Sequence, residues 1–193
     1  MSLTWILISA AAILVVAAVV FRDRIRGKAV PDAVRPGNRL PEFSAVHEDG
    51  QPVYSADLRG RTSVLMFVRG SWCPFCSKQV QNLTKHYKDI NDSGAHLILV
   101  TPQPLETTRR VADFFDVDFE FWLDKDLAIG KQLGLVQSSG VPDGYKQEYG
   151  NDTLWPTTLV VDADGVIRYT ELSRFIADRP DAAKLLRVVE KLG

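Results

Sequence analysis

The sequence has little cysteine and no excess of charge of either sign. Its 193 residues carry 23 Lys and Arg against 24 Asp and Glu, a formal net charge of −1. This balance excludes a nucleic-acid binder that relies on phosphate neutralisation. Two cysteines are too few for a disulfide-stapled scaffold, and a hydrophobic content of 46% is too high for a disordered chain. The length predicts one globular domain plus an additional segment.

A long apolar run lies at the N-terminus. Residues 3–21 carry no charged side chain, and about 19 helical residues are enough to cross a hydrocarbon core of roughly 30 Å. A cleaved signal peptide is the alternative, but Met1–Trp5 has none of the basic side chains that such a peptide carries. We therefore predict an uncleaved transmembrane anchor helix over residues 1–21.

The residues after this run predict its orientation and a linker. Residues 22–39 combine a basic flank with proline and glycine, which is typical of a linker. Positive side chains next to a membrane span stay on the cytoplasmic side. We therefore expect the main domain in the cytoplasm, with the extracytoplasmic (periplasmic) side as the alternative. The basic side chains of the flank are Arg22, Arg24, Arg26 and Lys28.

Residues 40–193 predict one compact α/β domain. Short apolar runs mark buried strands, apolar residues at helical spacing mark helices, and two Asp-Gly pairs mark hairpin turns. This order predicts a mixed sheet with helices on both faces. The expected strands are 43–46, 51–54, 63–68, 96–100, 119–123, 158–161 and 166–170, and the expected helices are 76–90, 104–115, 127–133 and 182–192.

The two cysteines, Cys73 and Cys76, stand three residues apart where a buried strand gives way to a helix. A helix N-terminus stabilises a thiolate, and a second thiol one turn away can close onto it, so this context favours a redox pair. A zinc site needs four ligands, and the three histidines show no paired ligand spacing. We therefore expect no metal and no cofactor. Two buried inert thiols are the remaining alternative.

The run Arg69-Gly70-Ser71-Trp72-Cys73-Pro74-Phe75-Cys76 after an apolar strand resembles the thioredoxin superfamily. More narrowly, it resembles the redoxin branch, which contains the alkyl hydroperoxide reductase and thiol-specific antioxidant (AhpC/TSA), or peroxiredoxin-like, proteins. The segment Trp155-Pro156-Thr157 is similar to the start of the superfamily's cis-proline strand. The resemblance covers about residues 40–193 and implies a thioredoxin-like mixed sheet flanked by helices.

The resemblance also implies roles for individual residues. Cys73 would be the attacking thiolate and Cys76 the resolving thiol. A cis Trp155–Pro156 bond would face the cysteines. The residues expected to support the site are Arg69, Trp72, Pro74, Phe75, Trp155, Pro156 and Thr157. Peroxiredoxins carry a threonine three residues before the attacking cysteine, and Gly70 stands at that position here.

The sequence therefore predicts a membrane-anchored thiol–disulfide oxidoreductase that uses the Cys-Pro-Phe-Cys pair on a protein or small-thiol disulfide. One alternative is a peroxiredoxin-like thiol peroxidase, in which Cys73 reacts with a hydroperoxide and Cys76 resolves the sulfenic acid. The other alternative is a non-catalytic accessory subunit of a membrane protein complex, held by small residues of the anchor.

An irregular segment, Val136–Trp155, leads into Pro156 and interleaves glycines with Tyr145 and Tyr149. Loops of this length are usually functional or disordered. The two interpretations are an aromatic lid or docking surface beside Cys73 and a disordered insertion.

Overall fold

One seven-stranded mixed sheet forms the centre of the fold, and the computed structural model describes residues 11, 16, 28–115, 120–174, 178–179 and 181–192. The strand order is β2-β1-β5-β4-β3-β8-β9. The three central strands β5, β4 and β3 pair in parallel, and the outer strands pair antiparallel. The strands are β1 (Ser44–His47), β2 (Pro52–Tyr54), β3 (Ser63–Phe67), β4 (His96–Thr101), β5 (Glu120–Leu123), β8 (Thr157–Val161) and β9 (Ile167–Leu172).

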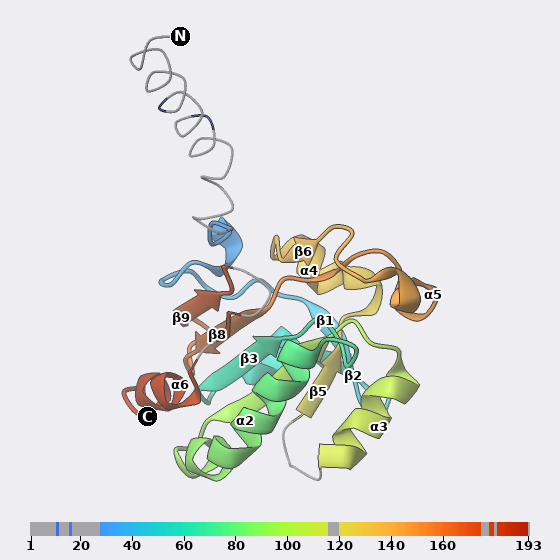
Figure 1. The fold of residues 1–193 in the computed structure, drawn as a ribbon. Helices are drawn as coiled ribbons and strands as arrows, with labels where there is room; N and C mark the ends of the chain where they lie inside the picture. The colour runs from blue at the N-terminus through green and yellow to red at the C-terminus, as the bar shows by residue number, and fades with distance from the viewer. Residues whose placement is uncertain are drawn as a thin grey trace.

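Helices cover both faces of the sheet (Figure 1). Two of them are the crossover connections β3-α2-β4 and β4-α3-β5 that parallel strands require. One face carries α2 (Pro74–Asp92), α3 (Leu105–Phe115) and α6 (Ala182–Val189), and the opposite face carries the short α4 (Ala128–Gln132). The short 3-10 helices are η1 (Asp32–Val34), η2 (Ser55–Leu58), η3 (Lys125–Leu127) and η4 (Asp143–Tyr145). The predicted thioredoxin-like arrangement, a mixed sheet between helices, is confirmed.

The apolar pattern of β3 explains why the core has two halves. All five residues of β3 are buried, as expected for a central strand covered on both faces. Val64 and Met66 pack with α2 and α6, whereas Leu65 and Phe67 pack into the cluster on the opposite face. Alternate side chains of one strand thus serve two cores, because successive Cβ atoms point to opposite faces.

Residues 30–40, which the sequence places in or next to the linker, pack against the domain. Val34 is fully buried in the core, and its carbonyl accepts a hydrogen bond from the Thr170 hydroxyl. Arg39 forms an isolated bridge with Val166. This part of the linker is therefore an edge of the fold, because Val34 gains more by burial than by remaining in an extended tether.

The prediction of a single-pass membrane protein with a cytoplasmic domain is corrected. Among the described residues, no helix combines the length and the apolar character that crossing a bilayer requires. The predicted span itself, residues 3–21, lies outside the described residues apart from Ala11 and Val16. The basic flank at residues 22–26 also lies outside them.

The segment Val136–Trp155 is ordered by short elements of its own. β6 (Val136–Gln137) pairs antiparallel with β7 (Thr153–Leu154), which closes the segment at its base. Between them lie η4 and the one-turn helix α5 (Lys146–Tyr149). The interpretation as a disordered insertion is therefore wrong.

Candidate active site

β3 leads the chain directly to the cysteine pair. The strand ends at Phe67, and Cys73 is the N-cap residue of α2, with Pro74 in its first turn. Proline suits this position because its φ is already helical and its missing N–H is not needed there. The backbone N–H of Cys76, one turn into the helix, donates to the Cys73 carbonyl at 3.0 Å. Both cysteines therefore lie at the N-terminal end of α2, as predicted.

Gly70 shapes the turn that precedes the pair. Its φ is +134°, and a Cβ placed on it would lie 2.8 Å from Nε1 of Trp72. Its carbonyl accepts the Cys73 N–H at 3.2 Å. Peroxiredoxins carry a threonine at this position. A threonine here would have to adopt the positive φ, and its Cβ would clash with the Trp72 ring. The turn therefore requires glycine.

Arg69 reaches the thiols from the end of β3. Its Nη1 lies 3.9 Å from Sγ of Cys73, and its backbone N–H donates to Sγ of Cys76 at 3.4 Å. The guanidinium lies over the Trp72 ring, 4.6 Å from the centroid, in a cation–π contact. Nη2 donates to the carbonyl of Gly140. The side chain is almost completely buried, so these contacts fix its position.

Arg179 reaches the same thiols from the segment after β9. Its Nη2 lies 3.4 Å from Sγ of Cys76 and 4.0 Å from Sγ of Cys73. Nη1 donates to the Asp178 carbonyl at 2.7 Å. Within the described part of the chain, no carboxylate pairs with the guanidinium of either Arg179 or Arg69. Both positive charges are therefore available to the sulfur atoms.

The two thiols have opposite acidities. The pKa of Cys73 is lowered from 9.0 to about 5, chiefly by the hydrogen bond from the Cys76 side chain, and further by the backbone N–H of Cys76 and the charges of Arg69 and Arg179. The pKa of Cys76 is raised, because it retains the proton that it donates to Cys73 and because it is buried. The predicted order of acidity is confirmed, and Cys73 is the thiolate at neutral pH.

The predicted difference in burial between the two thiols is not observed. Cys73 is 1% exposed and Cys76 is 2% exposed, and both are free thiols. The pKa of Cys73 is therefore lowered by hydrogen bonds and nearby charge despite its burial, whereas hydrogen bonding and burial together raise that of Cys76. Cys73 is covered by its neighbours in the loop before α2, although it lies at the end of the helix.

The segment between β6 and β7 packs against the cysteine loop through aromatic side chains. Tyr145 stacks on Trp72 with ring centroids 6.0 Å apart, and Tyr149 meets the same ring edge-on at 6.5 Å. The Tyr149 hydroxyl lies 3.1 Å from that of Ser71. Thr153 donates to the Arg69 carbonyl at 2.8 Å. These contacts place the segment beside the site, as the aromatic lid interpretation predicts.

The prediction of a cis Trp155–Pro156 bond is wrong, since the described residues contain no cis peptide bond. The chain enters β8 extended, with Thr157 opposite Phe67 of β3 and the Pro156 carbonyl accepting the Ser173 N–H at 3.0 Å. A trans bond is the ordinary state of an X-Pro pair, and this strand start imposes no turn that would require the other. Besides the two cysteines themselves, the groups that contact the sulfurs are instead Arg69 and Arg179.

The side chains of Trp155 and Thr157 make their hydrogen bonds to backbone carbonyls. The indole N–H of Trp155 donates to the Ser173 carbonyl, and the Thr157 hydroxyl donates to the Trp155 carbonyl at 2.9 Å. Both residues lie at the sheet edge from which the cysteine loop departs, but no hydrogen bond within the described residues joins them to a thiol. They position the start of β8 rather than contact the reacting atoms.

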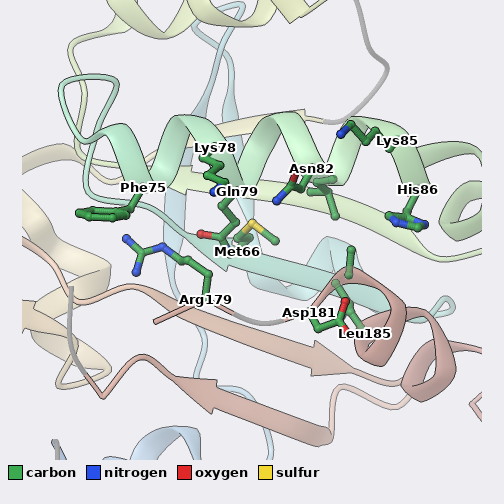
Figure 2. A pocket seen from close by; sticks show the side chains of 12 residues that line it. Met66, Phe75, Lys78, Gln79, Asn82, Lys85, His86, Arg179, Asp181 and Leu185 are labelled. Atoms are coloured by element: carbon green, nitrogen blue, oxygen red, sulfur yellow. The ribbon is translucent and has the colours of Figure 1, made fainter. Parts of the chain in front are cut away.

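Two cavities flank the first turns of α2. An apolar cavity of about 440 Å³ lies between α2 and α3, and Cys76, Val80, Leu99 and Phe121 are among its lining residues. A groove of about 510 Å³, lined by both charged and apolar side chains, lies between α2 and α6, where Figure 2 shows Phe75 and Arg179 facing each other at one end. The exposed Phe75 side chain therefore lines the groove and not the thiol pair itself.

A buried dithiol at a helix N-terminus, on a mixed sheet flanked by helices, defines a thiol redox protein of thioredoxin-like fold. The Redoxin family matches residues 35–186. The chain therefore belongs to the Redoxin family.

Individual relatives agree with this assignment. The chain is similar to peroxiredoxin Bcp of Escherichia coli K12, with 23% identity over 138 residues that cover 70% of this chain and 84% of the relative. Its fold is similar to that of peroxidoxin BcpB from Mycobacterium tuberculosis, with a TM-score of 0.69, 19% identity, and coverage of 83% and 99% of the two chains. A peroxiredoxin-like protein from Aquifex aeolicus gives a TM-score of 0.70 at 17% identity, covering 86% and 92%.

Sequence reasoning did not find Arg179. The sequence around it, Asp178-Arg179-Pro180, follows no motif, and 103 residues separate it from Cys76. Arg69 was found because it belongs to the run that contains the cysteines. Only the folded chain brings the second arginine to the pair.

Proposed function

We propose that the protein is a thiol peroxidase that reduces hydroperoxides with the Cys73–Cys76 pair. The observation that carries this proposal is the convergence of Arg69 and Arg179 on two thiols, of which Cys73 has a pKa of about 5. The thiolate is the nucleophilic form of cysteine, so Cys73 is ready to react at neutral pH. The peroxiredoxin names of the relatives support the same reaction.

The reaction has two balanced steps. The Cys73 thiolate attacks the terminal oxygen of the hydroperoxide, the O–O bond breaks, and an alkoxide leaves and takes up a proton to become an alcohol. Cys73 is then a sulfenic acid. The Cys76 thiol attacks its sulfur, the S–O bond breaks, and water leaves as the disulfide forms. The three-residue spacing places Cys76 one turn away for this second step.

The two guanidiniums favour the first step electrostatically. Negative charge moves from the Cys73 sulfur to the leaving oxygen. The Arg69 guanidinium lies beside the Cys73 sulfur, and the Arg179 guanidinium lies beside both sulfurs. Fixed positive charge in a water-poor site stabilises such developing charge without having to reorganise. The buried position of Arg69 makes this contribution larger than it would be in water.

The apolar cavity indicates the kind of hydroperoxide. Its lining includes Cys76 together with aliphatic and aromatic side chains such as Val68, Val80 and Leu99, while Thr107 and Arg110 contribute polar groups. A cavity of about 440 Å³ can hold the organic group of an alkyl or aryl hydroperoxide next to Cys76, one helical turn from the attacking Cys73, which does not itself line the cavity. Hydrogen peroxide makes no use of such a cavity, so an organic hydroperoxide is the better substrate.

Thiol–disulfide exchange, the first prediction from the sequence, uses the same two cysteines on a different partner. The relatives support the peroxidase alternative better, because they are named as peroxiredoxins. A membrane-anchored oxidoreductase is not proposed.

The test is a stoichiometric reaction of the reduced protein with hydroperoxide. One equivalent of cumene hydroperoxide is expected to disappear as two thiols per chain are lost and one disulfide forms, faster than with hydrogen peroxide. Reduction of insulin disulfides by the protein with dithiothreitol is measured in parallel. Rapid insulin reduction without hydroperoxide consumption would contradict the proposal and favour exchange, and inactivity in both assays would favour the accessory-subunit alternative.

A further inference from the structure

We propose that the groove between α2 and α6 binds a small organic anion, and that the bound anion draws the Arg179 guanidinium away from the two cysteine sulfurs. Arg179 joins the two places, because it lines the groove and also lies 3.4 Å from Sγ of Cys76 and 4.0 Å from Sγ of Cys73. Neither cysteine lines the groove, so the ligand acts on the thiols only through this side chain. The inference goes beyond the proposed function and does not depend on the substrate that the thiolate attacks.

The charge of the groove favours an anion. Asp181 is the single acidic residue among the described residues that line it, and its carboxylate already accepts a backbone N–H at the start of α6. Within the described ranges, no ion pair involves either lysine of the groove, and no carboxylate pairs with Arg179. The basic residues that line the groove are Lys78, Lys85, His86 and Arg179.

The guanidinium of Arg179 can take a further partner. Nη1 donates to the Asp178 carbonyl at 2.7 Å, whereas Nη2 contacts only the two sulfurs and the buried Nε donates to nothing in the described part of the chain. An oxyanion accepts two parallel N–H bonds from a guanidinium, and this bidentate geometry makes such pairs strong. Nε and Nη2 form one such pair of donors. Because Nη2 is the group that faces the sulfurs, an oxyanion bound in this way competes with them directly.

A second buried polar group faces the same space. Figure 2 shows the Gln79 side chain extending from α2 toward the segment that carries Arg179. Gln79 is 8% exposed, and its Oε1 has no hydrogen-bond partner among the described residues. Such atoms are uncommon in folded proteins. A half-turn of the amide brings its NH2 group to the same place, where it donates to an oxyanion.

The remaining side chains of the groove indicate that the ligand also has an apolar body. Phe75 is 39% exposed and faces Arg179 at one end of the groove (Figure 2), and Met66, Leu83 and Leu185 line it further along. The volume of about 510 Å³ lies within the range of small-molecule sites, about 300–1,000 Å³. The class of ligand is therefore a small organic oxyanion with an aromatic body.

Ligand binding and the acidity of Cys73 are linked in both directions. The charge of Arg179 helps to lower the pKa of Cys73, so an anion that draws the guanidinium away raises this pKa. Arg69 keeps its contact with the Cys73 sulfur at 3.9 Å, so the thiolate is weakened but not lost. By reciprocity, an anion that raises the pKa by about half a pH unit binds about three-fold less tightly to the thiolate form. The ligand therefore binds more tightly when Cys73 carries no charge.

The experiment follows alkylation of Cys73 by iodoacetamide in the reduced full-length protein across a pH range, with and without benzenesulfonate. This probe combines an aromatic ring with an oxyanion that stays ionised throughout. Saturating benzenesulfonate is expected to raise the pH midpoint by about half a pH unit, whereas neutral benzyl alcohol and sodium chloride at equal ionic strength leave it unchanged. The plateau rate above the midpoint is expected to stay the same, which separates a change in pKa from obstruction of the thiol.

Two neighbouring lysines of α2 provide a matched comparison. Lys85 lines the groove, whereas Lys88 is exposed and does not. Lys85→Gln is expected to raise the benzenesulfonate concentration for half of the effect about three-fold, the contribution of one exposed charge, and Lys88→Gln is expected to leave it unchanged. In Arg179→Met the midpoint is expected to respond no further to the probe. Cys73→Ser, which cannot form the thiolate, is expected to bind benzenesulfonate about three-fold more tightly than the reduced protein in calorimetry at pH 7.

A midpoint that benzenesulfonate still raises in Arg179→Met would overturn the proposal, because the effect would not pass through this side chain. An equal response to sodium chloride, or equal losses in Lys85→Gln and Lys88→Gln, would overturn it by showing a general field rather than a site. So would a lower plateau with an unchanged midpoint, which would show obstruction. A protein that consumes no hydroperoxide would instead refute the proposed function, and none of these measurements uses that reaction.

Discussion

The guanidinium of Arg179 lies 3.4 Å from the sulfur of Cys76, although 103 residues separate the two in the chain. The contact exists because β9 runs beside β8, next to β3, and Arg179, which lies between β9 and α6 in the sequence, is placed at the N-terminal end of α2. Arg179 and Arg69 therefore approach the dithiol from two different segments. The acidity of the pair depends on the fold as a whole and not on the Cys-Pro-Phe-Cys sequence alone.

Replacement of this guanidinium is expected to weaken the thiolate. Arg179→Met keeps the apolar part of the side chain but removes a positive charge that lowers the pKa of Cys73. The pH midpoint for iodoacetamide alkylation is expected near the Cys73 pKa of about 5 in the unmodified protein, and about one pH unit higher in this variant. Arg179→Lys keeps the charge and is expected to restore most of the shift.

Arg187→Met is the matched control for this measurement. Arg187 lies on α6, is exposed, and is not among the residues that line the groove. Its replacement is expected to leave the alkylation profile unchanged. An unchanged profile in Arg179→Met would show that the charge of this arginine does not reach the sulfur.

The two cysteines are expected to differ when each is replaced. Cys73→Ser removes the low-pKa thiol and is expected to abolish hydroperoxide consumption. Cys76→Ser leaves the attacking thiol but nothing to resolve its product, so a sulfenic acid on Cys73 is expected to accumulate. Dimedone labelling followed by mass spectrometry of the whole protein checks both outcomes.

The reverse pattern would contradict this assignment of roles. Dimedone labelling of Cys76 in Cys73→Ser, with no reaction in Cys76→Ser, would make Cys76 the attacking thiol. The hydrogen-bond donors do lie closer to Cys76, with the Arg69 N–H and the Arg179 guanidinium each at 3.4 Å, than to Cys73, at 3.9 and 4.0 Å. The experiment therefore shows whether the lower pKa or the shorter distance to the hydrogen-bond donors determines which thiol attacks.

Gly70 is expected to be more sensitive to substitution than another glycine of similar conformation. Both Gly70 and Gly60 have positive φ, +134° and +94°, but a Cβ at Gly60 meets no atom within 4 Å. Gly70→Ala adds the clash with Trp72 to the backbone strain, so we expect a loss of about 2–3 kcal/mol in the free energy of unfolding, against about 1 kcal/mol for Gly60→Ala. Urea denaturation measures both, and equal losses would exclude a role for the Trp72 contact.

Much of the sheet could be predicted because its signals are local. Four of the five buried residues of β3 form one apolar run, and Asp49-Gly50 and Asp164-Gly165 mark the turns of hairpins that do form. The buried residues Val80, Leu83 and Ile90 recur at helical spacing and predict α2. The position of both cysteines at its N-terminus follows from the same pattern.

The remaining features depend on contacts between distant segments. Nothing near Arg179 in the sequence indicates that it meets the thiols, and nothing near Val34 indicates that a linker residue is fully buried. The cis bond expected at Pro156 came from a resemblance, and the extended start of β8 does not adopt it. Where a side chain is fixed by tertiary packing, local pattern carries no information about it.

Glu120, which is far from the thiols in the sequence, is expected to make the free energy of unfolding depend on pH in the acid range. Its carboxylate bonds Nε2 of His96 at 2.7 Å and the indole N–H of Trp122 at 2.9 Å, and the first of these contacts chiefly lowers its pKa from 4.5 to about 2. Because the folded-state pKa is lower than the unfolded one, its stabilising effect is complete above pH 4.5 and is lost as the pH falls toward 2. Glu120→Gln is therefore expected to reduce the free energy of unfolding by about 1–2 kcal/mol at pH 6, after allowance for solvent screening, and by progressively less toward pH 2.5.

Glu106→Gln, at an exposed position of α3, is the control. Its free energy of unfolding is expected to stay within about 0.5 kcal/mol of that of the unmodified protein at every pH. Urea denaturation across this range measures both variants, and a loss in Glu120→Gln that is the same at pH 6 and pH 2.5 would show that the carboxylate contributes packing rather than charge.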